Sequence, residues 1–370
     1  MPFSYEKDRG RMQPSSDVKI PDNHPLSSNK ALESFGNELL AWYDEHKREL
    51  PWRTSPSLYK TVVSEFMLQQ TRVSTVLPYF DRWLEKFPDF KTLAASSEEK
   101  VVKAWEGLGY YSRARNLWKL AKEIQAFDAP PEDPGTWQTF PGVGPYVAAA
   151  VTSISFGSAT AVADGNVVRI LTRIFAHDER FRDGATAQRK LRPLAQALLS
   201  HNRPGDYNQA VMELGATVCH RRSPLCLTCP VLQFCQAGQR GDAETYPNID
   251  KKKIEHLSID RLWIVRNEAL LLRKIPNDSK RLAGLYELPR PEDLPKHLKP
   301  LKTTHIATKR RAIANQSIEE RILGVELKDN RELSAAANLK FISFEKLNEV
   351  TLSGPHRKWV KELQEKLEFA

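Results

Sequence analysis

The sequence predicts two folded parts, a larger all-α region followed by a smaller α+β region. Between residues 29 and 235 apolar residues recur at helical spacing, as at Leu58, Val62 and Phe66. Further along, RLWIVRNEALLLRK has apolar clusters around a central Asn, which predicts a β-hairpin, and LKFISF has the composition of a strand. A chain of 370 residues with 41% hydrophobic content is long enough to bury two cores.

These patterns divide the chain into four segments. Residues 1–28 are polar, contain Pro and Ser and carry both charge signs, which is typical of a disordered leader. The helical region covers residues 29–235. Residues 236–255 have the Gly, Pro and Lys composition of a linker. The α+β region covers residues 256–370.

The charge of the chain favours a polyanionic partner. Its formal net charge is +9, with 55 Lys and Arg interspersed among 46 Asp and Glu. The sequence has no secretion signal and no apolar run of the roughly 18 residues that a membrane span needs. We therefore expect a cytoplasmic, nucleoid-associated bacterial protein that acts as a monomer.

The four cysteines indicate a metal centre. Cys219, Cys226, Cys229 and Cys235 form a C-x6-C-x2-C-x5-C arrangement that can bring four thiolates to one centre. Zinc and iron-sulfur clusters both accept four thiolates, but structural zinc more typically uses two close pairs, and here there is one. Disulfides are the alternative, which the lack of a secretion signal disfavours.

Two glycines precede a nearly all-apolar helix in FPGVGPYVAAAVTSISFG. Gly142 and Gly144 permit the positive φ of a tight hairpin, and backbone N–H groups at a helix N-terminus can bind an anion. The alternative is an ordinary turn.

Two acidic residues, Asp164 and Glu65, are candidates for catalysis. Asp164 and the nearby amide Asn166 come directly before the amphipathic run VVRILTRIF, where their ordinary role is to cap the helix. Glu65 lies at the edge of an apolar helix face, where desolvation would favour its protonated form at neutral pH. Most helix glutamates are merely solvated, which is the alternative for Glu65.

These motifs together resemble a known family. The cysteine spacing and the glycine hairpin are similar to those of the endonuclease III superfamily of DNA glycosylases. The string SEFMLQQTRV is similar to that of its adenine glycosylase branch, usually called MutY, and GLGYYSRARNL and YNQAVMELGATVC agree with that branch. The resemblance covers about residues 29–235. It implies a helix-hairpin-helix glycosylase core with a 4Fe-4S cluster bound by the four cysteines.

The resemblance also implies roles for individual residues. Glu65 would protonate adenine, and Asn166 would orient Asp164. Asp164 would stabilise the positive charge on the sugar or attack the sugar transiently, two alternatives that stay open. The substrate contacts that it implies are Trp52, Arg53 and Gln209 around adenine, Gln70 and Thr71 toward the opposite strand, Leu108 and Tyr110 as wedges, and Leu68. The phosphate contacts that it implies are Gly142, Gly144, Arg221 and Arg222. Core positions for Leu108 and Tyr110, and a surface amide for Gln209, are the alternatives.

The C-terminal part resembles, more weakly, the Nudix-type domain that reads 8-oxoguanine. The similarity lies in GLYELP and in TTH at residues 303–305. It implies a lesion-reading turn at Thr304 and His305, although family members commonly have Phe-Ser-His and the aromatic residue is absent here. The implied partner is duplex DNA that contains adenine opposite 8-oxoguanine or guanine.

Two other functions compete with adenine excision. An endonuclease III-type glycosylase and lyase would act on oxidised pyrimidines through a lysine Schiff base. Such enzymes have lysine where this chain has Tyr146, which forms no imine, so Tyr146 predicts a monofunctional enzyme. A non-catalytic iron-sulfur protein that binds DNA would explain the cysteines, the hairpin and the charge, but it would not need both Glu65 and Asp164.

Tyr146 supplies a first prediction. Borohydride should trap little or no covalent adduct between the protein and its DNA substrate, because trapping requires an imine and tyrosine has no amine. Denaturing gel electrophoresis of the borohydride-treated complex measures the adduct. Efficient trapping would instead favour the lyase.

Overall fold

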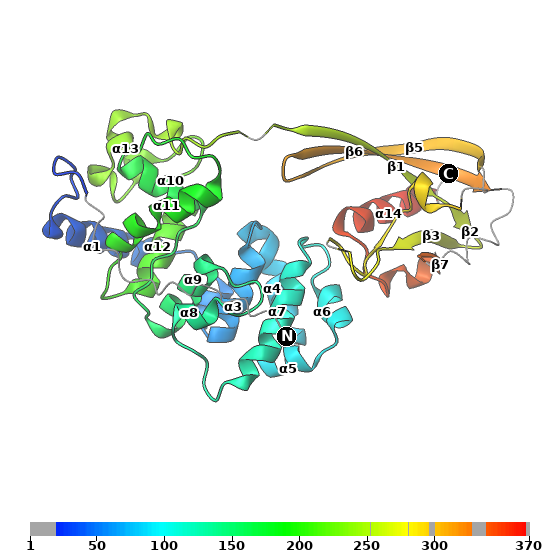
Figure 1. Ribbon diagram of the computed structural model, residues 1–370, viewed down its shortest axis with the longest axis horizontal. Coiled ribbons are helices and arrows are strands. Elements are labelled where there is room, and N and C mark those ends of the chain that lie inside the picture. Colours follow the sequence, from blue (N-terminus) through cyan, green and yellow to red (C-terminus); the bar gives the residue numbers. More distant parts are fainter. Residues whose placement is uncertain (1–19, 252, 280, 296–299, 328–337, 368–370) are drawn as a thin grey trace, which may run out of the picture. The chain divides into compact units, whose positions relative to one another are not determined.

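The computed structural model describes residues 20–251, 253–279, 281–295, 300–327 and 338–367 (Figure 1). The chain divides into two compact units. The first unit consists of Met1–Val62, Pro131–Thr139 and Val143–Asp250. The second consists of Val63–Pro130, Phe140–Gly142 and Lys251–Ala370.

The first unit is helical. Its α-helices are α1 Asn29–His46, α2 Pro51–Thr54, α8 Pro134–Trp137, α9 Pro145–Phe156, α10 Gly165–Ile174, α11 Gly184–Ala197, α12 Pro204–Thr217 and α13 Gln236–Arg240. Three short 3-10 helices follow α12, namely η2 Cys226–Thr228, η3 Leu232–Phe234 and η4 Ala243–Thr245. Phe35, Leu171, Leu191 and Tyr207 from four of these helices meet in one buried core. Proline at the start of α2, α9 and α12 favours helix initiation, since the first turn does not need its N–H.

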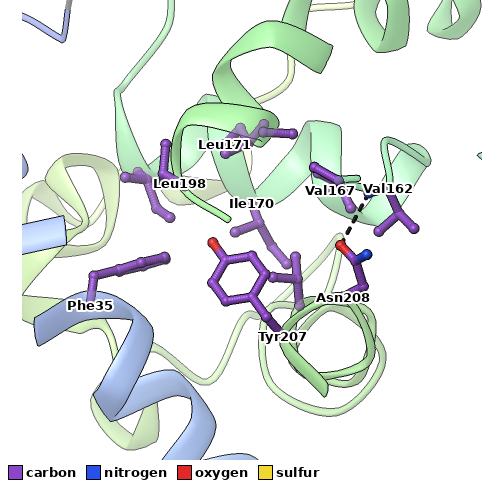
Figure 2. A pocket seen from close by; sticks show the side chains of 12 residues that line it. Phe35, Val162, Val167, Ile170, Leu171, Leu198, Tyr207 and Asn208 are labelled. Atoms are coloured by element: carbon purple, nitrogen blue, oxygen red, sulfur yellow. Dashed lines mark hydrogen bonds between the residues drawn. The ribbon is translucent and has the colours of Figure 1, made fainter. Parts of the chain in front are cut away.

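A buried asparagine joins this core to the extended segment before α10. Asn208 on α12 accepts a hydrogen bond from the backbone N–H of Val162 (3.1 Å) and donates to the Ser153 hydroxyl (2.8 Å) and the Thr160 carbonyl (2.9 Å). Figure 2 shows Asn208 and Tyr207 beside a small cavity whose other walls are mainly apolar side chains of the same core. Asn208 therefore satisfies the backbone of a segment that has no regular structure.

The second unit combines helices and strands. Helix α3 Leu58–Leu68 begins in the first unit and ends in the second. The remaining helices are α4 Val73–Lys86, α5 Phe90–Ala95, α6 Glu98–Ala104, α7 Ser112–Glu123, η1 Ile124–Ala126, η5 Pro291–Asp293, η7 Phe344–Asn348 and α14 Gly354–Leu367. The strands are β1 Glu255–Trp263, β2 Val265–Arg266, β3 Ala269–Lys274, β4 Tyr286–Glu287, β5 Pro300–Ile313, β6 Gln316–Leu327 and β7 Leu339–Ser343.

The strands form two sheets. In the first, β6 lies between β1, to which it is parallel, and β5, to which it is antiparallel. In the second, β3 pairs antiparallel with β2, β4 and β7. Trp359 on α14 shares a buried core with Ile322 of the first sheet and with Leu270 and Leu272 of the second. Helix α14 therefore packs against both sheets (Figure 1).

The predicted fold class, an all-α core followed by an α+β part, is confirmed. The predicted hairpin forms between β2 and β3, where Asn267 and Glu268 adopt positive φ values of 47° and 55°. Such a two-residue turn matches the twist of its strands, and asparagine tolerates this conformation. The LKFISF segment forms β7. No helix within the described ranges combines the length and the apolar character needed to cross a membrane.

Two predicted segment assignments need correction, although the division into domains stays a prediction. Residues 1–19 of the predicted leader lie outside the described residues. Residues 20–28 pack onto the first unit, because Leu26 is fully buried and the His24 ring stacks on Phe175. The predicted linker at 236–255 begins with α13 and η4, whose Ala237 and Ala243 are buried. A few buried side chains among polar ones are therefore enough to attach both segments to the first unit.

The buried amide supplies a second prediction. Asn208→Leu should lower the free energy of unfolding by about 2 to 4 kcal/mol, because the Val162 N–H and the Ser153 hydroxyl lose a buried hydrogen-bond partner. Denaturant unfolding followed by circular dichroism measures the change.

Gln196→Leu is the matched control. Gln196 bonds the Ala161 N–H and the Ala159 carbonyl of the same segment, but it is only partly buried, so water can replace it. If both variants lose the same free energy of unfolding, burial is not the reason that Asn208 stabilises the fold.

Candidate functional site

Asp164 is held by three hydrogen bonds at the N-terminus of α10. Its Oδ1 accepts from the backbone N–H groups of Asn166 and Val167, both at 2.8 Å, and therefore caps the helix. Its Oδ2 accepts from the Asn166 side-chain amide at 3.0 Å. Both carboxylate oxygens are thus fixed, and the capping role does not exclude a chemical one.

Asn166 is itself fixed by Arg169 one turn later on α10. Arg169 Nη2 donates to Asn166 Oδ1 (2.9 Å) and to the Gly215 carbonyl (2.8 Å), and Nε donates to the Cys219 carbonyl (2.8 Å). A Cβ atom on Gly215 would lie 2.7 Å from Asn166 Cβ, so α12 can approach Asn166 only through glycine. The orientation of Asp164 therefore depends on α12 and on the segment that starts at Cys219.

The surroundings of Asp164 raise the pKa of its carboxyl group above the usual value. The side chain keeps some exposed area, but protein atoms surround it densely, and this desolvation raises its pKa. The N–H groups of Val167 and Asn166 and the charge of Arg169 act in the opposite direction without reversing the shift. A carboxylate that is poorly solvated interacts strongly with a cation that develops beside it.

Arg53 joins Gln209 to a buried carboxylate in the first unit. Trp52 is buried on α2, and Arg53 donates from Nε to Gln209 Oε1 (3.1 Å) and from Nη1 to Glu213 Oε2 (2.9 Å). Arg48 Nη2 also donates to Glu213 Oε2 at 2.9 Å. Burial alone would raise the pKa of Glu213, but the bonds from Arg48 and the charge of Arg53 hold it below its usual value. Glu213 holds both arginines, and Arg53 thus fixes the Gln209 amide with its oxygen toward the guanidinium of Arg53.

The four cysteines lie in one loop of the first unit, and all four thiols are free. Arg173 Nη1 donates to Cys219 Sγ (3.2 Å) and to the His220 carbonyl (2.6 Å), and the Gly238 N–H donates to Cys235 Sγ (3.3 Å). Arg221 and Arg222 are exposed on this loop. Among the described residues, no three His, Cys, Asp or Glu side chains are grouped so as to hold one metal ion.

The glycine hairpin precedes α9 as predicted. Gly142 has φ 77°, and a Cβ there would lie 2.7 Å from the Asn116 side chain, which explains the need for glycine. Gly144 is the N-cap of α9 and is followed by Pro145. On the first turn of α9, the Tyr146 hydroxyl lies 2.9 Å from Met212 Sδ on α12.

Glu65 lies on α3 in the second unit and is buried, with 6% of its area exposed. Leu68 ends this helix, and Gln70 follows with φ 57°. Arg113 on α7 fixes this end of α3, because its Nη1 donates to the carbonyls of Phe66, Met67 and Gln69 at 3.1, 2.8 and 2.5 Å. Thr71 Oγ1 donates to the Gln69 carbonyl as well.

The two predicted wedge residues differ in exposure. Leu108 is 6% exposed, so the core alternative describes its packing in this structure, whereas Tyr110 is 52% exposed and has φ 48°. Arg113 Nη2 donates to the carbonyls of Leu108 (3.1 Å) and Gly109 (3.2 Å).

The predicted turn at residues 303–305 is wrong. Thr303, Thr304 and His305 lie within β5, paired with Val325, Gly324 and Leu323 of β6. Two β-branched threonines favour a strand. A bulge between His305 and Ala307 shifts the register, and the pairing with β6 then continues to Ile313. The three side chains are exposed on the strand, and His305 Nε2 lies 2.9 Å from Thr308 Oγ1.

The sequence prediction missed the buried charged residues that orient the others. Arg113, Arg169 and Glu213 lie within quoted strings, but their roles depend on carbonyls and side chains far away in the sequence. One available signal was a basic residue on an otherwise apolar helix face, as in VVRILTRIF, because arginine seldom occupies such a position without partners.

Comparison with known proteins finds relatives for most of the helical part. Residues 63–196 match the HhH-GPD superfamily base excision DNA repair protein family. The chain is 45% identical over 238 residues to the adenine DNA glycosylase of Homo sapiens, a match that covers 61% of this chain and 43% of that protein. It is 41% identical over 202 residues to the adenine DNA glycosylase of Mycolicibacterium smegmatis, covering 54% of this chain and 68% of that protein.

A solved structure shares the helical fold. A thermostable thymine-DNA glycosylase superposes with a TM-score of 0.50 and 25% sequence identity, covering 57% of this chain and 98% of that one. The present chain spans less than half the length of the human relative, 43%.

The capping aspartates supply a third prediction. Asp164 should titrate above the ordinary aspartate value of 3.8, because burial raises its pKa. As the pH is lowered, its carboxylate should therefore become protonated at a higher pH than an ordinary aspartate does. Asp183 caps α11 in the same way, but hydrogen bonds from Thr186 lower its pKa to about 2. Carboxyl 13C NMR, assigned with Asp164→Asn and Asp183→Asn, measures both.

Arg169→Met should move the titration of Asp164 to still higher pH and leave that of Asp183 in place, since the charge of Arg169 lowers the pKa of Asp164. Titration of Asp164 at or below the pH of Asp183 would show that the hydrogen bonds outweigh burial.

Proposed function

Because the chain belongs to the adenine DNA glycosylase family, within the HhH-GPD superfamily, we propose that it hydrolyses the N-glycosidic bond of adenine mispaired with 8-oxoguanine or guanine in duplex DNA. The observation that carries this proposal is the fixed, desolvated carboxylate of Asp164. Asp164 and the buried Glu65 both fall within the segment that matches the family, residues 63–196. The enzyme is monofunctional, since Tyr146 replaces the lysine that a lyase would use.

Glu65 and Asp164 divide the chemistry between them. Glu65 protonates the extruded adenine, which makes the base a neutral leaving group. As the bond breaks, positive charge develops on the sugar, and the Asp164 carboxylate stabilises it. Asn166 acts as a positioning residue, because its amide fixes Asp164 Oδ2. Water then completes the hydrolysis.

The remaining proposed site residues bind DNA. The adenine is surrounded by Trp52, Arg53 and Gln209. Because Gln209 Oε1 accepts a hydrogen bond from Arg53, the amide nitrogen of Gln209 points away from Arg53 and acts as the donor to adenine. Backbone N–H groups at Gly142 and Gly144, with the side chains of Arg221 and Arg222, bind phosphates. Toward the opposite strand we place Leu68, Gln70, Thr71, Leu108, Tyr110, Thr304 and His305. The protein acts as a monomer, and its Nudix-like part reads the lesion through the exposed residues Thr304 and His305 of β5.

The four cysteines fit a 4Fe-4S cluster. Their thiols are free, and their sulfurs interact electrostatically with one another. Arg173 donates a hydrogen bond to Cys219 Sγ, and the Gly238 N–H donates one to Cys235 Sγ. Hydrogen bonds to ligand sulfurs of this kind orient and stabilise the thiolates of iron-sulfur sites. When bound, the cluster would make the loop rigid and keep Arg221 and Arg222 in place.

The proposed reaction supplies a fourth prediction. Single-turnover assays on duplexes with adenine opposite 8-oxoguanine, guanine or cytosine, followed by alkali, should show cleavage for the two mispairs. Glu65→Gln should slow excision by at least about 10²-fold because it removes the proton donor, and Asp164→Asn should do so by about 10²- to 10³-fold because it removes the charge.

Two control variants separate chemistry from folding. Asp183→Asn changes another helix cap in the same way, and Glu33→Gln changes an exposed helix glutamate. Both should excise adenine normally, and Glu65→Gln and Asp164→Asn should still bind the duplex. Equal loss of binding and excision in these two variants would make their roles structural and overturn the proposal.

The cofactor supplies a fifth prediction. The purified protein should be brown and contain iron and acid-labile sulfide. Cys226→Ser should reduce the iron content and either the folded yield or the affinity for DNA, because the loop depends on all four ligands. Leu227→Ser is the matched control, since this neighbouring side chain is 95% exposed. Zinc without iron, or full DNA affinity in metal-free Cys226→Ser, would contradict the cluster.

A further inference from the structure

The segment between α6 and α7 holds a tyrosine in a strained backbone conformation. We call Gly107–Tyr110 the GLGY loop. Gly107 and Gly109 have φ values of 104° and 72°, which glycine adopts readily, whereas Tyr110 has φ 48°, a left-handed conformation that a residue with a Cβ atom rarely adopts. A Cβ on Gly107 would lie 2.1 Å from the Tyr79 hydroxyl, so the loop is also tightly packed. Such a conformation persists only where surrounding contacts hold it.

Two residues that flank this loop bind the backbone of one distant residue within the second unit. Glu106 Oε1 accepts from the Leu352 N–H at 2.8 Å, and the Tyr111 hydroxyl donates to the Leu352 carbonyl at 3.1 Å. The Gly107 N–H in turn donates to the Tyr111 hydroxyl at 3.4 Å. Both ends of the GLGY loop are therefore attached to the segment before α14.

Charged side chains strengthen this attachment. Arg357 on α14 donates from Nε to Glu106 Oε1 (2.9 Å) and from Nη2 to the Val350 carbonyl (2.6 Å). Lys103 donates to Glu106 Oε2 (2.6 Å) and to the same carbonyl (2.8 Å). Only 13% of the Glu106 side chain is exposed, so its bonds are partly shielded from water and stronger than those of a surface pair.

Leu352 is in turn part of the sheet that contains β3 and β4. It is fully buried in the core that includes Trp359 and Leu270. It forms a parallel bridge with Tyr286 of β4, and the flanking residues Thr351 and Ser353 exchange backbone hydrogen bonds with Tyr286 at 2.9 and 3.1 Å. Glu106 and Tyr111 therefore bond a residue that is itself held by the sheet of β3 and β4.

The opposite side of the GLGY loop is joined to α3. Arg113 bonds the carbonyls of Leu108 and Gly109, and also those of Phe66, Met67 and Gln69 at the end of α3. The loop therefore lies between the sheet of the C-terminal part and the segment that carries Gln70 and Thr71.

We propose that Glu106 is a positioning residue through which the C-terminal part sets the conformation of the GLGY loop for the DNA strand opposite the adenine. This inference rests on the proposed function, because it assigns the loop to lesion discrimination. The C-terminal part contributes to the choice between 8-oxoguanine and guanine by holding the loop as well as by direct contact. Arg357 acts with Glu106, and neither residue needs to touch DNA.

Hydrogen exchange of the free, full-length protein tests the attachment without any DNA. Arg357→Met should raise exchange in a peptide spanning residues 105–112 by about tenfold, the value of one charge-assisted bond. Arg357→Lys should restore most of the protection. Arg115→Met is the matched control, because Arg115 also donates to a distant carbonyl, that of Ala283, without contacting the loop. No rise with Arg357→Met, or an equal rise with Arg115→Met, overturns the proposal.

Single-turnover excision then tests the consequence for recognition. Arg357→Met and Glu106→Gln should reduce the preference for adenine opposite 8-oxoguanine over guanine about three- to tenfold, while Arg115→Met keeps it. Raised exchange with an unchanged preference overturns the role in discrimination. If the wild-type chain excises no adenine, the proposed function fails, and the exchange comparison still decides whether Glu106 and Arg357 hold the loop.

Discussion

Carbonyl oxygens in segments without regular structure need hydrogen-bond donors, and buried arginines supply many of them in this chain. Arg113 binds five carbonyls from α3 and from the GLGY loop. Arg169 and Arg173, one turn apart on α10, bind the segment that begins at Cys219. A guanidinium has five donors in a fixed plane, so one side chain can fix several chain segments at once. The geometry around Asp164 and around the GLGY loop follows from this constraint.

Local patterns were sufficient to predict much of the fold. Periodicity predicted α9 and α10, the Asn-containing turn predicted the β2–β3 hairpin, and residue type alone predicted that Asp164 would cap a helix. These features depend on residues within a few positions of one another. The bonds of Arg113 to Phe66 and of Arg53 to Gln209 join residues 47 and 156 positions apart, and a single sequence contains no signal for such pairs.

The errors have the same origin. Whether Thr303–His305 form a turn or a strand depends on β6, which is the partner strand and follows later in the chain. The polar segment at residues 20–28 looked disordered by composition, yet one buried leucine and one stacked histidine fix it to the helical core. Composition describes average behaviour, whereas packing is decided by single contacts.

The close approach of α12 to α10 at Gly215 has a consequence for natural variation. Even a methyl group there would meet Asn166 Cβ at 2.7 Å and displace the amide that orients Asp164. Gly215 has no side chain that could react or bind, so its importance lies only in the space that it leaves for Asn166. Under the proposed function, a substitution at this position leaves a folded protein in which Asp164 is wrongly oriented and adenine is not excised. Such an allele is harder to recognise than one that destroys the protein, because the protein is still present in normal amounts.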